Sequence, residues 1–310
     1  MLAPMPNATD RLLRAYHSLQ GLCCGDAFGE RFFIPDSVAI PLIAQRSLPA
    51  PPWMFTDDTM MAISIVAILE EHGGIDQDHL ASSFAKLYDS SRGYGPAMHE
   101  LLRRIRHGAD WRDESSALFD GQGSFGNGSA MRVAPLGAYF ADDLDLAVEQ
   151  ARLSAVTTHC HAEAISGAIA VSLAAALACR HHESHTGRGE FLRQVLDRTP
   201  ESYVRHGIQR AIDLPDATSP DHAAGVLGRG SRVSCPDTVP FALWCAARHL
   251  DSYENALWTT VSGLGDRDTT CAIVGGIVAM SAGIASIPGA WLDCSEPLPR
   301  HVLKFCHLIR

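Results

Sequence analysis

The chain has 310 residues, of which 46% are hydrophobic, and it carries a formal net charge of −10 at pH 7. This length predicts a globular protein with one large core or two small ones, and the acidic balance argues against a nucleic-acid-binding surface, which needs clustered basic residues. Lysine occurs only at Lys86 and Lys304; neither position suits a phosphate-binding glycine loop or a Schiff base, which excludes P-loop NTPases and pyridoxal-phosphate enzymes.

Helical periodicity dominates the chain, because apolar residues recur at three- and four-residue spacing and strand-like alternation is scarce. Proline- and glycine-rich breakers separate the periodic segments. The prediction is one all-α domain over residues 1–310. Helices are expected at 10–29, 58–72, 76–90, 94–107, 145–155, 160–181, 189–197, 201–213, 236–250, 252–261 and 269–285.

The cysteines and the apolar segments indicate where in the cell the protein is expected. Nine cysteines without CxxC spacing are typical of reduced thiols in a cytoplasmic protein. The N-terminus has no basic flank followed by an apolar run, so no signal peptide is expected. Residues 164–179 and 271–288 approach membrane length, but their small side chains favour closely packed core helices. We therefore expect a cytoplasmic protein without a membrane partner.

The first candidate site opens the helix predicted at 58–72. The stretch FTDDTMMA places Thr56, Asp57 and Asp58 side by side at the helix start. Thr and Asp are favoured helix caps, and acids suit the positive end of the helix dipole. The alternative is a cation that relieves the repulsion between the adjacent carboxylates.

A second helix start repeats this chemistry near the other end of the chain. In GLGDRDTTC, Asp266, Asp268 and Thr269 precede a long helix of small residues. If the two starts meet in space, four carboxylates and two hydroxyls converge. An all-oxygen set favours Mg²⁺, Mn²⁺ or Ca²⁺ over Zn²⁺, and a metal pair sharing a bridging aspartate is one arrangement that fits.

A glycine-rich run at 121–129 is the third candidate. GQGSFG matches the GxGxxG spacing, but the preceding WRDESSALFD is too polar for a buried strand, which rules out a dinucleotide fold. Two interpretations remain: an ordinary connection, or a loop whose backbone N–H groups hold phosphate or ribose. Further along, THCHAEA places His159 and His161 on different sides of a helix start, which disfavours a zinc site with Cys160. A histidine there is either a cap or packed group, or a hydrogen-bonding partner for a sugar or a phosphate.

Six segments, taken in order, resemble the ADP-ribosylglycohydrolase family. Each is weak by itself, but together they span nearly the whole chain. The segments are GLCCGDAFG (21–29), FTDDTMMA (55–62), FGNGSAMRVAPLG (125–137), THCHAEA (158–164), DTVPFALWC (237–245) and GDRDTTCAIVGG (265–276).

The resemblance implies an all-α orthogonal bundle with a cleft that holds two Mg²⁺ or Mn²⁺ ions. It implies metal ligands at Thr56, Asp57, Asp58, Asp266, Asp268 and Thr269. The implied substrate-binding residues are Gly123, Ser124, Phe125, Gly126, Asn127, Gly128 and His159. Of the carboxylates, Asp57, Asp58 and Asp266 are the candidates for assisting proton transfer.

The implied activity is hydrolysis of the N- or O-glycosidic bond between ADP-ribose and a modified acceptor. A protein side chain, with arginine favoured, is the expected acceptor, and ADP-ribose is the product. The alternatives are an inactive ADP-ribose-binding or structural member of the family, and a hydrolase of a small ADP-ribose derivative.

The sequence departs from the family pattern at two positions. Phe33 stands where many members carry a glutamate that in some of them serves catalysis or substrate gating. Glu30, one helical turn earlier, is either a substitute for that glutamate or a solvated side chain. Arg267 stands where threonine is common, and its guanidinium either contacts a substrate phosphate or turns away to pair with an acid.

Overall fold

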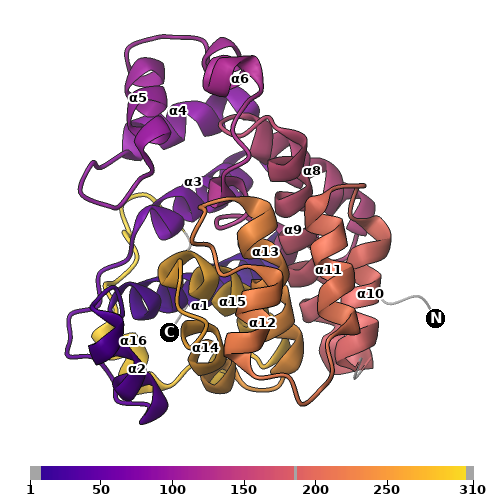
Figure 1. Cartoon of the computed structure of the whole chain (residues 1–310). Coiled ribbons are helices and arrows are strands. Elements are labelled where there is room, and N and C mark those ends of the chain that lie inside the picture. Colours follow the sequence, from indigo (N-terminus) through magenta and orange to yellow (C-terminus); the bar gives the residue numbers. More distant parts are fainter. Residues whose placement is uncertain (1–7, 185–186, 305–310) are drawn as a thin grey trace.

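A computed structural model describes residues 8–184 and 187–304, and over these ranges the chain is helical. The only β-pairing in the described ranges is two isolated bridges, Trp53 with Ser295 and Gly126 with Ser234. The predicted all-α class is confirmed (Figure 1). The α-helices are α1 (Ala8–Glu30), α2 (Asp36–Ala44), α3 (Asp57–His72), α4 (Gln77–Leu87), α5 (Pro96–Arg106), α6 (Trp111–Gly121), α7 (Ala134–Tyr139), α8 (Leu144–Val156), α9 (Ala162–Ser184), α10 (Arg188–Arg198), α11 (Tyr203–Asp213), α12 (Pro220–Leu227), α13 (Cys235–Arg248), α14 (Tyr253–Val261), α15 (Arg267–Ser281) and α16 (Gly289–Cys294).

Each predicted helix is present, and five further helices were not predicted: α2, α6, α7, α12 and α16. Most of these are short or interrupted, so they show little periodicity in sequence. Helix α12 lies between the helices predicted at 201–213 and 236–250, in a stretch where no helix was predicted. There Ser219 Oγ accepts a hydrogen bond from the N–H of His222 at 3.3 Å, and Pro220 occupies the first helical position.

The centre of the fold is the close pairing of α1 with α15. Three glycines of α1, spaced four residues apart, face the backbone of α15. A Cβ added at Gly25 would lie 2.2 Å from the carbonyl oxygen of Cys271, and one at Gly29 would lie 2.2 Å from that of Arg267. Gly21 faces Ala279 and Gly275 in the same way. Only glycine permits this approach, which fixes the register of the two helices.

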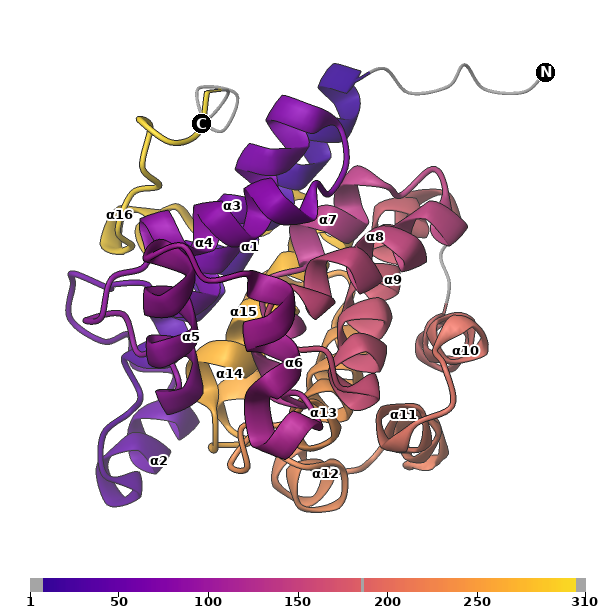
Figure 2. The same ribbon diagram turned by 90° about the horizontal axis from the view of Figure 1, so that it is seen from above.

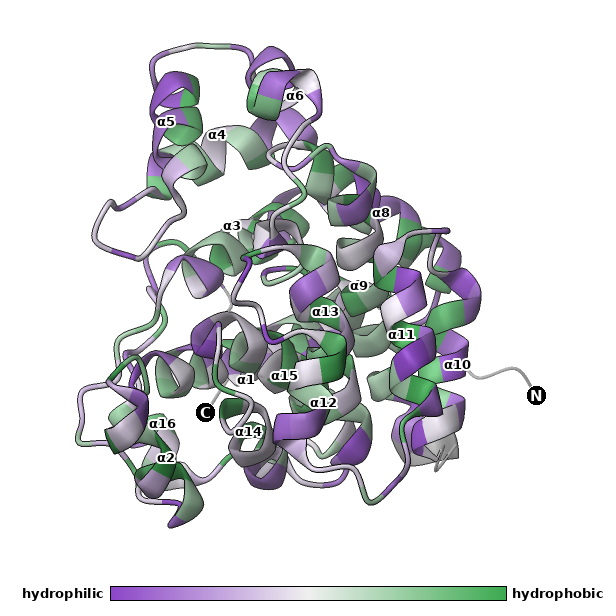
Figure 3. Cartoon of the chain, in the orientation of Figure 1, coloured by the Kyte–Doolittle hydropathy of each residue, from purple (hydrophilic) through white to green (hydrophobic). Residues whose placement is uncertain are grey.

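Helix α9 crosses the core beside this pair. Residues 162–181 are long and apolar enough to cross a membrane, but 78% of their most apolar stretch is buried inside the fold. Its small side chains pack against α7, α8, α13 and α15. The helix is therefore buried like a core helix. Figure 3 shows the hydrophobic colouring of α9 in the interior, whereas α11 and α12 carry hydrophilic residues on the outside.

The remaining helices form the periphery. Helices α4, α5 and α6 pack in succession and form a lobe at the top of Figure 1, above α3. Figure 2 shows α10, α11 and α12 along the opposite side of the molecule. The start of α3 faces the centre of the fold and its end leads into the lobe, so α3 joins the two parts.

Candidate active site

The two acidic helix starts meet in the structure. Thr269 Oγ1 at the start of α15 lies 3.4 Å from Asp58 Oδ2 at the start of α3, across 211 residues of sequence. Carboxylate oxygens of Asp58 and Asp268 lie within 4.8 Å of each other and of Asp26. The convergence expected from the sequence is therefore present, and it joins the buried Asp26 and Asp58 with the partly buried Asp268 in one cluster.

Helix capping and clustering occur together at these starts. Thr56 is the N-cap of α3, and its Oγ1 accepts a hydrogen bond from the N–H of Asp58 at 3.4 Å. Asp266 is the N-cap of α15, but its side chain caps no N–H of the helix. Its Oδ2 instead accepts a hydrogen bond from Asn127 Nδ2 at 2.7 Å. Capping therefore accounts for Thr56 but not for the placement of Asp266.

Asp26 is a member of the cluster that the sequence analysis did not single out. It lies near the C-terminal end of α1, fully buried, between two of the glycines that face α15. Its carboxylate accepts hydrogen bonds from the backbone N–H and the hydroxyl of both Thr56 and Thr59, at 2.6–3.2 Å. Because both carboxylate oxygens of Asp26 accept these hydrogen bonds, we infer that Asp26 orients the start of α3. The one available signal was a single acid inside an apolar, glycine-rich helix.

Burial and mutual repulsion shift the titration of the cluster. Loss of solvent, more than any neighbour, raises the pKa of Asp57 to about 8, with the charge of Asp26 as the next cause. Burial also raises the pKa of Asp26 to about 6, although its hydrogen bonds oppose the rise. The pKa values of Asp58 and Asp268 lie well above the ordinary aspartate value for the same reasons. A cation between these groups would reverse the shifts, since opposite charge favours the ionised form.

The donor set fits a hard divalent cation. Oδ1 of Asp58 is buried and has no hydrogen-bond partner in the described part of the chain, which is costly for a carboxylate oxygen. The oxygens around it come from aspartates and threonines, the donors that suit Mg²⁺ and Mn²⁺. The residues present are therefore compatible with a metal centre at this cluster.

The acidic helix starts form the floor of a cleft of about 720 Å³, which Asp268 of the cluster lines together with Asp57 and Asp266. The cleft runs from the acidic helix starts outward, between the glycine-rich loop and the segment that leads into α5. Of the predicted site residues, the cleft is lined by Asp57, Asp266, Asp268, Thr269, Ser124, Phe125, Gly126, Asn127, Gly128 and His159, and it is also lined by Tyr94, Phe119, Arg232 and Val233. Thr56 and Asp58 lie behind this surface and contact the cluster from the protein side.

Two residues of the predicted glycine-rich loop, Asn127 and Gly123, have positions that contacts within the protein explain. Asn127 is buried and donates through Nδ2 to Thr238 Oγ1 at 3.1 Å as well as to Asp266. Its amide thus holds a carboxylate of the floor. Gly123 is not among the residues that line the cleft, and its φ is +75°. The absence of a side chain leaves room for Cys160, whose Sγ would lie 2.3 Å from a Cβ added at Gly123. Both residues are explained by protein contacts, so the expectation that they contact substrate gains no support from the geometry.

His159 projects into the cleft from a buried hydrogen-bond chain. Arg132, itself fully buried, donates through Nη1 to Thr158 Oγ1 at 2.9 Å. Thr158 Oγ1 lies 2.7 Å from His159 Nδ1. Since an arginine can only donate, the threonine hydroxyl has its own proton left for Nδ1. This arrangement assigns the neutral tautomer with the proton on Nε2.

The same surroundings keep His159 neutral. Burial, with a smaller effect from the charge of Arg132, lowers the pKa of His159 to about 3. Its Nε2 faces the glycine loop, 2.9 Å from the place where a Cβ on Gly128 would stand. His159 therefore presents an N–H donor beside Gly128. The neighbouring His161 turns elsewhere: its Nδ1 accepts a hydrogen bond from the N–H of Glu163 at 3.1 Å, as a cap of α9.

Two exposed phenylalanines stand at the mouth of the cleft. Phe119 and Phe125 have ring centroids 6.5 Å apart at an angle of 46°. Phe119 adopts a left-handed conformation (φ +54°), as does Asp120 after it, which breaks the last turn of α6. Exposed aromatic faces of this kind suit a planar, weakly hydrated ligand group. Phe119 was not predicted, because its role depends on this break in the helix.

Arg267 and Glu30 lie outside the residues that line the cleft. The guanidinium of Arg267 is buried, donates to the carbonyl oxygen of Phe32 and pairs with Asp36. Of the two orientations considered from the sequence, the structure shows the one in which the guanidinium points away from the cleft and pairs with an acid. The expectation that Arg267 contacts substrate is therefore not supported. Its charge lies 5.5 Å from the ring centre of Phe33, which is half-exposed. Glu30 ends α1, where burial first and then Asp26 raise its pKa.

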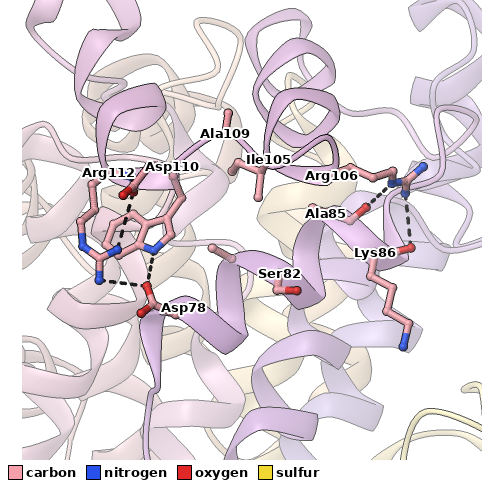
Figure 4. A pocket seen from close by; sticks show the side chains of 11 residues that line it. Asp78, Ser82, Ala85, Lys86, Ile105, Arg106, Ala109, Asp110 and Arg112 are labelled. Carbon is pink, nitrogen blue, oxygen red and sulfur yellow. Dashed lines mark hydrogen bonds and ion pairs between the residues drawn. The ribbon is translucent and has the colours of Figure 1, made fainter.

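A second hollow, of about 670 Å³, lies between α4, α5 and α6 (Figure 4). Its arginine and aspartate side chains are engaged in protein contacts. Arg106 Nε donates to the carbonyl oxygen of Ala85 at 2.7 Å, and Arg112 Nη2 lies 2.9 Å from a carboxylate oxygen of Asp78. Trp111 Nε1 also donates to Asp78, at 2.7 Å. These contacts hold the lobe together, and the hollow shares no lining residue with the acidic cleft.

Comparison with known proteins gives a consistent result. The family model described as ADP-ribosylglycohydrolase matches residues 7–307. The human protein named ADP-ribosylhydrolase ARH3 is 27% identical, with 93% of this chain and 91% of that protein aligned. An uncharacterized protein of Archaeoglobus fulgidus is 30% identical over 88% of both chains. A solved structure titled "ADP-ribosylglycohydrolase-related protein complex" shares the fold, with a TM-score of 0.65 over 97% of both chains at 23% identity.

Proposed function

This chain belongs to the ADP-ribosylglycohydrolase family and is a glycohydrolase, and from that premise we propose that it releases ADP-ribose from a modified protein side chain in a metal-dependent reaction. The observation that carries the proposal is the aspartate cluster at the inner end of a cleft with exposed aromatic rings at its mouth. Such a cleft offers separate surroundings for a reacting sugar and for an aromatic base.

Two Mg²⁺ or Mn²⁺ ions are the proposed cofactors, held by Thr56, Asp57, Asp58, Asp266, Asp268 and Thr269. The support is the all-oxygen donor set and the unpartnered Asp58 oxygen described above. When bound, such ions supply Lewis-acid stabilisation of developing negative charge and increase the acidity of water.

The residues of the chain itself would bind and orient ADP-ribose. Phe119 and Phe125 would stack on the adenine, since every base presents an aromatic face. The backbone N–H groups of Ser124, Phe125 and Gly128 and the Nε2–H of His159 would donate to the diphosphate or to a ribose hydroxyl. The N–H groups of Gly126 and Asn127 already donate to Ser124 Oγ and to the carbonyl oxygen of Val233. The ribose would then reach the floor of the cleft, next to Asp57 and Asp266.

The carboxylates at the floor of the cleft would carry out the proton transfers of the reaction. Breaking the bond at ribose C1″ requires a proton for the departing acceptor and removal of a proton from the attacking water. Asp57 lines the cleft, and its carboxylate would accept the proton of the attacking water. Glu30 is an additional candidate, because its charge acts on both Asp57 and Asp266.

We favour an arginine-linked acceptor. The support is the resemblance described above: Phe33 stands where many members carry a glutamate that matters for serine-linked substrates in some of them. Free ADP-ribose is the proposed product. The cytosol is the proposed location, and the structure is compatible with it, since each of the eight cysteines it describes is a free thiol.

The test is release of free ADP-ribose from arginine-, serine- and other-linked conjugates, each with Mg²⁺, with Mn²⁺ and with EDTA. We expect release from the arginine conjugate that stops with EDTA. Release only from a serine-linked conjugate would overturn the acceptor assignment, and release undiminished by EDTA would overturn the metal assignment. No release from any conjugate, together with ADP-ribose raising the melting temperature, would favour the non-catalytic alternative.

A further inference from the structure

A second group of metal-ligand side chains lies away from the cleft, at the corner between α3 and α4. His72 is the last residue of α3, Asp76 is the N-cap of α4, and His79 lies in the first turn of α4. Each offers one ligand atom, and the three atoms lie within 4.8 Å of one another. We propose that His72, Asp76 and His79 form a zinc-binding site that is distinct from the acidic cluster and independent of the proposed glycohydrolase reaction.

The spacing of the three side chains is close to that of ligands on one ion. Two ligands on a tetrahedral zinc ion, each roughly 2.0–2.1 Å from it, lie about 3.3 Å apart. His79 Nδ1 already lies 3.0 Å from Asp76 Oδ1. The rings of His72 and His79 have centroids 4.6 Å apart and are tilted by 38°. Small rotations of side chains, without backbone movement, would bring the three atoms to zinc distances.

The backbone holds the three residues at fixed positions. Helix α3 ends in a left-handed Gly73 (φ +69°), whose N–H donates to the carbonyl oxygen of Leu69 at 3.0 Å. Helix α4 begins with a side-chain cap, in which Asp76 Oδ1 accepts from the N–H of His79 at 3.0 Å. The ligands therefore stand on two capped helix ends joined by a short turn, which lowers the entropy cost of arranging them around an ion.

The donor types select a different metal from the one proposed for the cleft. Two imidazoles with one carboxylate suit zinc and similar late transition metals, whereas Mg²⁺ prefers oxygen ligands. The side chains of Asp76 and His79 are 41% and 60% exposed. An ion from solution can thus reach the site, and water can fill the fourth position.

Zinc at this corner would clamp the end of α3 to the start of α4. The other end of α3 carries Thr56, Asp57 and Asp58, and α4 opens the lobe that continues through α5 to Phe119 in α6. The clamp would therefore reduce movement of the lobe relative to the floor of the cleft. The expected readout is a higher melting temperature, without any requirement for zinc in turnover.

The experiment is zinc titration by calorimetry of protein freed of metal by chelation, in excess Mg²⁺ so that the acidic cluster is occupied by the competing ion. We expect one zinc equivalent for the wild type. Loss of an outer partner of a metal ligand typically weakens binding 10- to 100-fold, so His72→Ala and His79→Ala should each weaken it by at least about tenfold. Asp76→Asn should also weaken zinc binding while preserving the helix cap, since Asn caps as well as Asp.

Two controls separate this site from others. His206→Ala removes an exposed histidine that pairs with Glu201 on another face, and it should leave zinc binding unchanged. Asp266→Asn alters the acidic cluster and should also leave it unchanged, so the outcome does not depend on the proposed function. In parallel, zinc should raise the melting temperature of the wild type but not of His72→Ala. Equal zinc binding by the wild type and the two histidine variants, or no binding at micromolar zinc, would overturn the proposal.

Discussion

The floor and the mouth of the cleft are built in opposite ways. The floor consists of acids at the starts of α3 and α15, held where glycines of α1 allow α15 to approach. The acids of α3 are buried and those of α15 are partly buried. The mouth consists of Phe119 and Phe125, about half-exposed and carried by the broken end of α6 and the loop that follows it. The floor is close-packed, charged and desolvated, so small changes there should alter chemistry or folding. Changes at the mouth should alter binding alone.

The largest expected effect is at the floor, with Asp266→Asn. The substitution keeps the size of the side chain but removes a charge that the proposed reaction needs. We expect kcat/KM for ADP-ribose release to fall by at least about 10²-fold, the scale seen when one electrostatic group of an active site is lost.

The measurement is steady-state release of ADP-ribose at saturating Mn²⁺, together with metal binding by calorimetry. Asp216→Asn serves as control, because Asp216 is exposed and pairs with Arg188 on the surface. A fall of less than about threefold in the Asp266 variant would remove this carboxylate from the proposed machinery.

The second test changes the packing beneath the floor. In Gly25→Ala, the new methyl group would lie 2.2 Å from the carbonyl oxygen of Cys271, a backbone atom that cannot turn aside. We expect a loss of about 1–3 kcal/mol in the free energy of unfolding, as for other overpacked cores. Metal binding should weaken as well, because Asp26 follows Gly25 directly.

Gly225→Ala is the matched control for that substitution. Gly225 lies inside α12 with open space around the position of a Cβ. Alanine there should stabilise the protein by about 0.5–1 kcal/mol, through helix propensity alone. Chemical denaturation of both variants measures the difference. Similar midpoints for the two would show that close approach of α1 and α15 is not what fixes the floor.

At the mouth, Phe125→Ala should raise KM with little change in kcat. Stacking of a base on an aromatic ring is worth about 1–3 kcal/mol, so KM should rise roughly tenfold. Tyr203→Ala removes another exposed aromatic ring, on α11, and should change neither constant. If kcat falls as much as kcat/KM in Phe125→Ala, the ring acts on the reacting bond and the division between mouth and floor fails.

The same division explains what could be predicted from the sequence. The acids and threonines at 56–58, 266, 268 and 269 were predictable, because neighbouring acids at a helix start leave a local pattern in the chain. Asp26 was not, since its place in the cluster arises from the packing of α1 on α15. Phe119 depends on two consecutive left-handed residues, and a polar helix such as α6 gives no signal for where it breaks.

Arg267 illustrates a further limit of sequence reasoning. Its position between two acids allowed either a substrate contact or a turn toward the protein. The deciding contacts come from the carbonyl oxygen of Phe32 and the carboxylate of Asp36, more than 200 residues away along the chain. Contacts between distant segments of this kind leave no pattern near the residue itself.

A smaller effect is expected from Thr158→Val, which acts through His159 in the lining of the cleft. This change removes the acceptor of Arg132 Nη1 and the partner of His159 Nδ1 while keeping the volume of the side chain. One neutral hydrogen bond is worth about 1 kcal/mol, so kcat/KM should fall about fivefold.

Nitrogen-15 spectra should at the same time show the ring proton of His159 no longer confined to Nε2. Thr157→Val is the control, because Thr157 is equally buried and its hydroxyl donates only to the carbonyl oxygen of Ser154. An unchanged tautomer in Thr158→Val would mean that the threonine does not set it.

The smallest expected effect is the response of His159 to pH. Burial and the charge of Arg132 hold its pKa at about 3 in the folded protein, against an ordinary value of 6.5. Between these values the unfolded chain binds more protons, so the contribution of His159 to stability is complete above about pH 6.5 and is lost as the pH falls toward 3. Within the fold the ring should show no titration from pH 5 to 8 in nitrogen-15 spectra, with free histidine in the same sample as reference. An inflection of the His159 signal near pH 6.5 would contradict the assigned neutral donor. Its absence would leave groups other than His159 to set any pH dependence of turnover in this range.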